Sequence, residues 1–350
     1  MIRSLDLRLV VASLLLASGG LSAQPTIFLD RSYVVRMTPT KGFLYEGQPA
    51  IPLFLYRNTD SLYSSLGDPN PRWSTGRAFV LTPMLVIRQL SQKSAASQPV
   101  RTPSFMPKLM AQFVAARRIQ GDVSRTDGSL SALVLGVDGT FGHYSNGQAG
   151  CFRANYKPDV NGRCVIDGAA GPGSDTLNTV DGGFSTWYFR AQTRARFAHY
   201  RESLLFFAVT LGAGVDWHPS FLEPMGGMDS SLAAVYGRSR PFGSIELKRR
   251  TTVPCLSVFA LGWLPCGTGR VRATVKAEYI RVRPPGISPV ATTSELAWTF
   301  DRCVGFGAIV RLHRGQDYYN IALGHELNVI QYGFTFDLER NDPIRHAPQR

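Results

Sequence analysis

The sequence predicts an all-β protein, a transmembrane antiparallel β-barrel of about 12 strands. Apolar and polar residues alternate along segments of about ten residues or more, and aromatic residues cluster at the ends of these segments. The chain also begins like an exported protein, yet offers no apolar stretch long enough for a spanning helix. An even number of strands is usual for bacterial barrels built from one chain.

Residues 1–23 have the layout of a secretory signal peptide. Arg3 and Arg8 precede the apolar run LVVASLLLAS, and the small residues LSA end at Ala23, where we expect cleavage. The expected organisation is residues 1–23, a signal peptide; residues 24–338, an outer-membrane β-barrel; and residues 339–350, a periplasmic tail.

A period of two identifies the strands. In residues 131–146, odd positions such as Leu135 and Val137 are apolar, whereas even positions such as Asp138 are polar or small. One face of residues 184–198 collects charged and amide side chains, which need a wet interior: Arg190, Gln192, Arg194 and Arg196. A soluble β-sandwich would show the same alternation and is the alternative fold.

Candidate strands follow one another along the whole mature chain. They cover residues 26–37, 50–58, 77–90, 107–118, 131–146, 184–198, 203–217, 233–250, 256–264, 270–283, 296–313, 317–326 and 328–338. Some of these are expected to merge or split, which leaves about 12. Residues 91–104 and 151–183 are rich in small and polar residues and are predicted to be loops.

The charge of the chain is strongly basic. The net charge of +13 falls to +12 without the leader, which carries two arginines and one aspartate. Export argues against a nucleic-acid partner, and the arginines are scattered through the strands rather than gathered in one block. Two interpretations stay open: binding of anionic lipid or lipopolysaccharide phosphate, and a cationic lumen with basic rims.

Cysteine usage agrees with export. In an oxidising compartment disulfides are the default, and Cys151 with Cys164 and Cys255 with Cys266 would each close a short loop. Cys303 is then left over. The spacing of cysteines and histidines supports no zinc site.

The segment GHYSNG, residues 142–147, places two polar side chains on an apolar face. His143 and Ser145 continue the row of Leu135 and Val137 at the end of its strand, where polar groups are costly unless they have partners or a function. Side chains two apart share a face, so an imidazole can reach the serine and activate its hydroxyl as a nucleophile for acyl transfer. The alternative is that His143 lies in the headgroup zone and Ser145 already in the loop.

HYSNG, residues 143–147, resembles the His-x-Ser-Asn-Gly motif of the outer membrane phospholipase A family, calcium-dependent twelve-stranded barrels whose active site faces the outer leaflet. HYSN also resembles the motif of the lipid A deacylases, which form much smaller barrels, and the chain length favours the phospholipases. The resemblance implies a bacterial outer-membrane acyl hydrolase with Ser145 as nucleophile, His143 as general base and the Gly147 amide as oxyanion donor. Asn146 is expected to be a structural hydrogen-bonding residue.

The chain departs from both families at the residue that orients the histidine. The phospholipases use an asparagine on the next strand, just after a Ser-Trp pair, and the deacylases use a glutamate, but the segment FSTWYFRAQ has neither. Its parity puts Ser185 outward beside the dyad, so Ser185 is the predicted third member and Asn178 the next candidate. The resemblance further implies Ca²⁺, with the Gln148 carbonyl as a ligand by position, and a possible homodimer.

Three functions therefore remain open. The first is hydrolysis of phospholipid acyl esters, and the second is removal of an acyl chain from lipid A. The third is a non-catalytic barrel or pore that keeps the motif, suggested by the arginine-rich lumen face of residues 184–198 and by the missing orienting residue.

Overall fold

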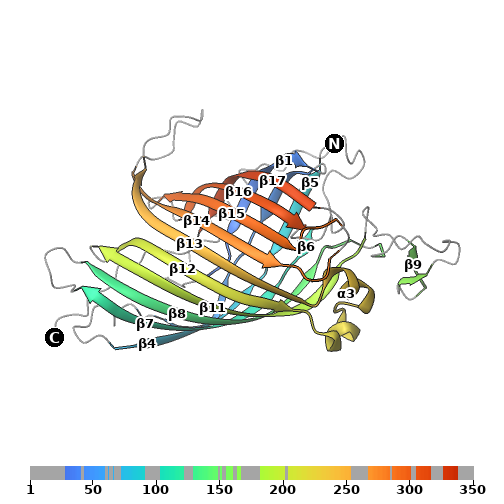
Figure 1. Cartoon of the computed structure of the whole chain (residues 1–350), viewed down its shortest axis with the longest axis horizontal. Helices are drawn as coiled ribbons and strands as arrows, with labels where there is room; N and C mark the ends of the chain where they lie inside the picture. Colours follow the sequence, from blue (N-terminus) through green and yellow to red (C-terminus); the bar gives the residue numbers. More distant parts are fainter. Residues whose placement is uncertain are drawn as a thin grey trace.

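A computed structural model shows one closed antiparallel sheet (Figure 1). The structure describes residues 28–40, 43–59, 62, 66, 72–90, 103–121, 129–148, 150–151, 155–160, 164–166, 182–201, 204–253, 267–283, 286–300, 305–316 and 326–337. Among them, no helix is long and apolar enough to cross a membrane.

Twelve strands, counted within the described residues, form an up-and-down barrel, as predicted. Three of them are interrupted and carry two labels each: β2 (Phe43–Gln48) with β3 (Leu53–Asn58), β4 (Ser74–Thr82) with β5 (Leu85–Leu90), and β6 (Ser104–Phe105) with β7 (Lys108–Gly121). The others are β1 (Ser32–Thr40), β8 (Leu130–Ser145), β11 (Ser185–Arg201), β12 (Leu204–Trp217), β13 (Ser239–Val253), β14 (Gly267–Tyr279), β15 (Val290–Phe300), β16 (Phe306–Gln316) and β17 (Glu326–Phe336). Pairing of β1 with β17 closes the ring.

Proline causes the three interruptions. Pro49, Pro83 and Pro107 each lie between the two segments of one strand. Proline has no N–H to give to the ladder, so pairing breaks at each of them. The chain nevertheless keeps its course, because Leu85 N–H donates to the Pro49 carbonyl and His143 N–H donates to the Pro107 carbonyl.

The outer face of the barrel wall is apolar and the inner face is polar or small, as predicted. Along β8 the exposed and buried side chains alternate without a break; Val137 on the outer face is 55% exposed and Asp138 on the inner face 2%. An apolar outer surface around a polar interior is the arrangement of a barrel in the outer membrane. The chain is therefore an outer-membrane β-barrel protein.

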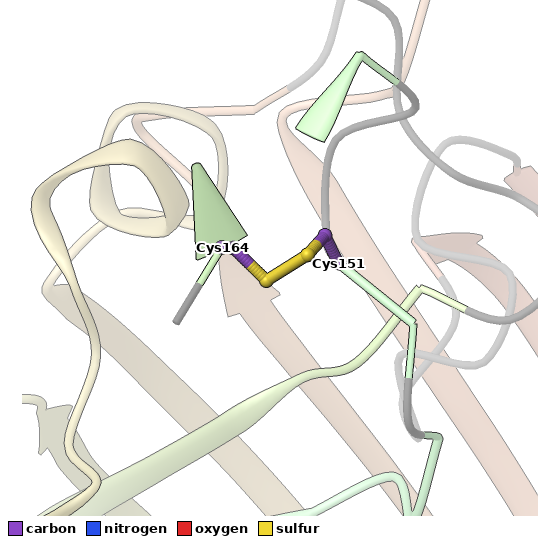
Figure 2. Close-up of a disulfide and its surroundings, with 2 residues drawn as sticks. All are labelled: Cys151 and Cys164. Carbon is purple, nitrogen blue, oxygen red and sulfur yellow. A yellow bond between two sulfur atoms is a disulfide. The ribbon is translucent and has the colours of Figure 1, made fainter. Parts of the chain in front are cut away.

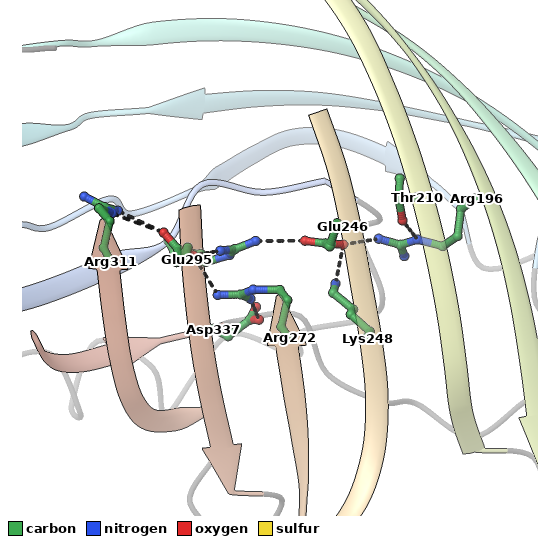
Figure 3. A network of polar contacts seen from close by, with 9 residues as sticks. Arg196, Thr210, Glu246, Lys248, Arg272, Glu295, Arg311 and Asp337 are labelled. Carbon is green, nitrogen blue, oxygen red and sulfur yellow. Dashed lines mark hydrogen bonds and ion pairs between the residues drawn. The ribbon is translucent and has the colours of Figure 1, made fainter. Parts of the chain in front are cut away.

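Ion pairs fill the middle of the lumen (Figure 3). Glu246 on β13 binds Lys248 at 3.3 Å and Arg196 at 3.4 Å. Glu295 on β15 binds Arg311 at 3.1 Å. Arg196 on the predicted charged lumen face of β11 thus finds an acidic partner on β13, two strands away in the sheet, because a charged group that leaves bulk water needs an oppositely charged partner.

The N-terminal residues differ from the prediction. The strand expected over residues 26–37 begins at Ser32, and residues 28–31 instead enter the lumen. Phe28 lies between the guanidinium groups of Arg194 and Arg196, 4.2 and 5.0 Å from its ring centroid. Arg31 bridges the two acidic centres of the lumen, pairing with Glu246 at 2.9 Å and also with Glu295.

Two further expected strands are corrected. The strand expected over 233–250 starts too early, because Ser230–Tyr236 is the helix α3 and β13 begins at Ser239. The single strand expected over 296–313 is two strands, since β15 ends at Phe300 and β16 begins at Phe306. Gly305, which has a left-handed φ of 82°, precedes β16, and a Cβ there would strike the Asp337 backbone. The strand expected over 256–264 lies outside the described residues. The strand expected over 317–326 also lies outside them, apart from residue 326.

Long connections gather at the end of the barrel where β8 and β12 finish. Residues 146–184 follow β8, and residues 218–238 follow β12 and include the 3₁₀ helix η1 (Ser220–Met225) and α3. The other end has shorter connections, such as residues 202–203 between β11 and β12. Since outer-membrane barrels have long extracellular loops and short periplasmic turns, the end that bears α3 and β9 in Figure 1 is extracellular.

One of the two predicted disulfides is present. Cys151 and Cys164 are bonded, with their Cα atoms 5.6 Å apart (Figure 2). This bond links the end of the motif segment to the small hairpin of β9 (Tyr156–Pro158) and β10 (Cys164–Ile166). Cys255, Cys266 and Cys303 lie outside the described residues, as do the leader and the C-terminal tail.

Candidate active site

His143 and Ser145 lie on the outer face of β8, at its extracellular end. They continue the outward row of Val137 and Phe141, and the residues between them point into the barrel. In the pairing of β8 with β11, Ser145 is opposite Ser185 and His143 is opposite Trp187. The pairing therefore brings the predicted residues His143, Ser145 and Ser185 to one patch of the lipid-facing wall.

Asn146 fixes the backbone that follows Ser145. Its side chain is fully buried, and its Oδ1 accepts the amides of Gln148 at 3.1 Å and Phe184 at 2.9 Å. Its Nδ2 donates to the Gly182 carbonyl at 2.9 Å. The structural role expected for Asn146 is the one observed, since it joins the end of β8 to the start of β11.

Gly147 places its amide beside the serine. Its φ of 68° lies in the left-handed region, which glycine adopts without a steric penalty. The turn directs the Gly147 N–H toward Ser145 Oγ, 3.2 Å from the nitrogen. When an acyl carbon is bonded to Ser145 Oγ, an amide at this distance can also donate to the oxyanion on that carbon.

His143 is held by aromatic packing. Its ring centroid is 4.6 Å from that of Trp187, with the planes at 53°. Trp187 stacks in turn on Phe141, at 5.1 Å and 7°. His143 Nδ1 is buried and has no hydrogen-bond partner among the described residues.

The connection after β12 reaches over the rim to this patch. Ser185 Oγ donates to the Gly226 carbonyl at 3.0 Å, and Trp187 Nε1 donates to the Met225 carbonyl at 2.8 Å. No local sequence pattern predicts this contact, because the partners lie 38 and 41 residues apart. Ser185 donates its hydroxyl proton to this hydrogen bond, and its oxygen can still accept a hydrogen bond from another donor.

The described residues do not form a calcium site on their own. The carbonyl oxygens of Gln148 and Gly150 converge on Gly183, where a Cβ would lie within 2.9 Å of both. Calcium takes six to eight oxygen ligands and favours carboxylates. No group of three or more acidic, histidine or cysteine side chains is placed to hold a metal ion in the described part of the chain. Asn178 lies outside it, as do Asp167, Asp175 and Asp181 of the long loop.

Comparisons with known proteins find similarity in structure and not in sequence. No protein-family model matches the chain, and no curated protein is similar to it. Among solved structures, outer membrane phospholipase A from Escherichia coli is 10% identical with a TM-score of 0.41, covering 88% of this chain and 92% of that chain. An active-site mutant of the same protein is 12% identical with a TM-score of 0.40, covering 92% and 95%.

A third solved structure is a Salmonella typhi outer membrane phospholipase dimer with bound calcium. It is 12% identical with a TM-score of 0.41, and the match covers 92% of this chain and 95% of that chain. Identity and scores at this level carry no site residue from these proteins to this chain.

Proposed function

We propose that this barrel is an outer-membrane serine hydrolase that cleaves acyl esters of phospholipids, with His143 and Ser145 as its catalytic dyad. One observation carries the proposal. A histidine and a serine share the lipid-facing row of one strand at the extracellular rim, and a backbone amide lies 3.2 Å from the serine oxygen. Lipid esters of the outer leaflet lie at the depth of such a rim.

The geometry supports acyl transfer through a covalent intermediate. His143 takes the proton of Ser145 as Oγ attacks the ester carbonyl carbon, and the Gly147 amide stabilises the oxyanion that forms. When the ester C–O bond breaks, the protonated His143 gives its proton to the departing alkoxide. Water, deprotonated by His143, then attacks the acyl carbon. As the bond from this carbon to Ser145 Oγ breaks, His143 returns the proton to Oγ, so that the fatty acid leaves and the dyad is restored.

The third member and the metal are parts of the proposal that need their own tests. Ser185 is the predicted partner of His143. If Ser185 Oγ accepts a hydrogen bond from His143 Nδ1–H, the variant Ser185→Ala will have a lower turnover than the wild type. Calcium is what the resemblance of residues 143–147 implies, with the Gln148 carbonyl as a ligand, and no step of the reaction is assigned to it. Assays with calcium and with a chelator test this requirement.

The first prediction concerns the nucleophile. Ser145→Ala removes the attacking oxygen and should reduce ester hydrolysis by about 10³-fold or more, by analogy with triads that lose one member. The assay presents purified protein in detergent micelles with phospholipid or with lipid A, and mass spectrometry identifies the released fatty acid. Ser131→Ala, an outward serine at the other end of β8, is the control.

Each outcome of this assay decides between the functions. Release from phospholipid alone supports the proposal, and release from lipid A alone identifies a deacylase. Wild-type turnover in Ser145→Ala would show that the nucleophile is another residue. No release from either lipid, with or without calcium, would leave a barrel that keeps the motif without the chemistry.

A further inference from the structure

His143 needs an orienting contact, and the described structure supplies packing where a hydrogen bond is expected. In a serine hydrolase the base must hold one ring orientation to take and return the serine proton. His143 Nδ1 is buried without a partner among the described residues, and the Ser185 proton is bonded to the Gly226 carbonyl. Among the described residues, the imidazole has a ring contact with the indole of Trp187, with the two ring centroids 4.6 Å apart.

Trp187 is itself fixed on two sides. Its ring stacks on Phe141 almost in parallel, at 7°, and this contact opposes a tilt of the indole away from the wall. Its N–H is bonded to the carbonyl of Met225, 38 residues away in sequence. An aromatic ring held at its face and at its polar edge is a rigid neighbour.

We propose that Trp187 is a positioning residue that holds the His143 imidazole toward Ser145, and that η1 sets its position through the Met225 carbonyl. This inference rests on the proposed hydrolase function and deepens it. Trp187 takes no part in bond making or breaking. It restricts the rotation of the base, which is the task that a hydrogen-bonding side chain has in other serine hydrolases.

The experiment compares three variants of the full-length protein in micelles. Trp187→Leu removes the ring, Trp187→Phe keeps a ring without the N–H, and Phe189→Leu is the matched control. Phe189 lies on the same face two residues along and packs on Phe141 and Trp217. Steady-state hydrolysis gives kcat and KM separately, and ¹⁵N-histidine NMR reports the tautomer and the ring order of His143.

A misplaced base lowers turnover rather than binding, so Trp187→Leu should lose about 10²-fold in kcat, with KM little changed. Trp187→Phe should recover only part of this loss, because it keeps a ring beside His143 but lacks the N–H that is bonded to Met225, and Phe189→Leu should turn over like the wild type. The His143 resonances should broaden or change tautomer most in Trp187→Leu, less in Trp187→Phe, and not in Phe189→Leu. Equal losses in Trp187→Leu and Phe189→Leu, or a loss confined to KM, would overturn the positioning role.

Failure of the proposed function is recognised separately. If wild-type protein hydrolyses neither lipid, the hydrolase proposal fails, and the NMR comparison still decides whether Trp187 orders His143. Unchanged His143 resonances in Trp187→Leu would then reject the inference by themselves. Ser185→Ala completes the set, because wild-type kcat in that variant would leave Trp187 as the orienting contact.

Discussion

At the scale of single residues, the candidate site combines contacts along one strand with contacts that cross the rim. His143 and Ser145 could be placed on one face because their spacing is two and the strand alternates without interruption. The contact of Trp187 with Met225 could not, because it depends on the path of a connection 38 residues away. Local patterns specify which face a side chain takes, and tertiary structure specifies its neighbour across the rim.

His218 is a buried histidine that makes the stability of the rim depend on pH. It follows β12, outside the membrane-spanning strands, and its Nδ1 lies 3.0 Å from Thr186 Oγ1. Burial lowers the pKa of His218 from 6.5 to about 4, and Arg240 acts in the same direction, while Asp216 opposes both. The unfolded chain therefore takes up a proton at a higher pH than the folded chain.

The sign of the pH effect follows from this lowered pKa. Stability from the neutral His218 is fully present above pH 6.5 and is lost as pH falls toward 4, by up to about 3 kcal/mol. We expect the urea-unfolding free energy of the wild type to fall more across this range than that of His218→Asn. His199→Gln, on β11, is the control. Identical slopes for wild type and His218→Asn would contradict the prediction.

At the scale of elements, strands were predictable where one face meets lipid and the other meets water. β8, expected over 131–146, occupies Leu130–Ser145. The helix α3 was missed because its seven residues are too few to establish a helical period, although Asp229 is a recognisable N-cap that accepts the Leu232 amide at 2.7 Å. The split of residues 296–313 was missed because both parts alternate in the same way.

Residues 28–31 act as an internal plug, and their removal should open the lumen. Asp30 lines two lumen cavities of about 300 and 240 Å³, pairs with Lys108, and so stands between these spaces. We expect the wild type to form no stable channels in planar bilayers and the triple variant Phe28→Ala, Asp30→Ala, Arg31→Ala to conduct ions. Glu223→Ala, which removes an exposed ion pair at the rim, is the control. Stable wild-type channels would instead favour a pore function.

At the scale of the whole molecule, the fold and the chemistry depend on the same division of the barrel wall. The inner face carries ion pairs, and residues 28–31 lie among them in the lumen. The proposed hydrolysis would therefore take place on the outer face at the extracellular rim. A lipid would reach Ser145 from the leaflet, along the same apolar surface that holds the barrel in the membrane.

The membrane assignment itself makes a depth-dependent prediction. Val137 is at the middle of β8 on the outer face, whereas Tyr279 is at the extracellular end of β14. An arginine at the bilayer midplane costs about 2–4 kcal/mol, and near the interface about 0–1 kcal/mol. Val137→Arg should therefore lower the unfolding free energy in lipid vesicles far more than Tyr279→Arg, as measured by urea titration of tryptophan fluorescence. In a water-soluble protein both arginines would be solvated at little cost, so equal and small effects would show that this face meets water and that the barrel does not span a bilayer.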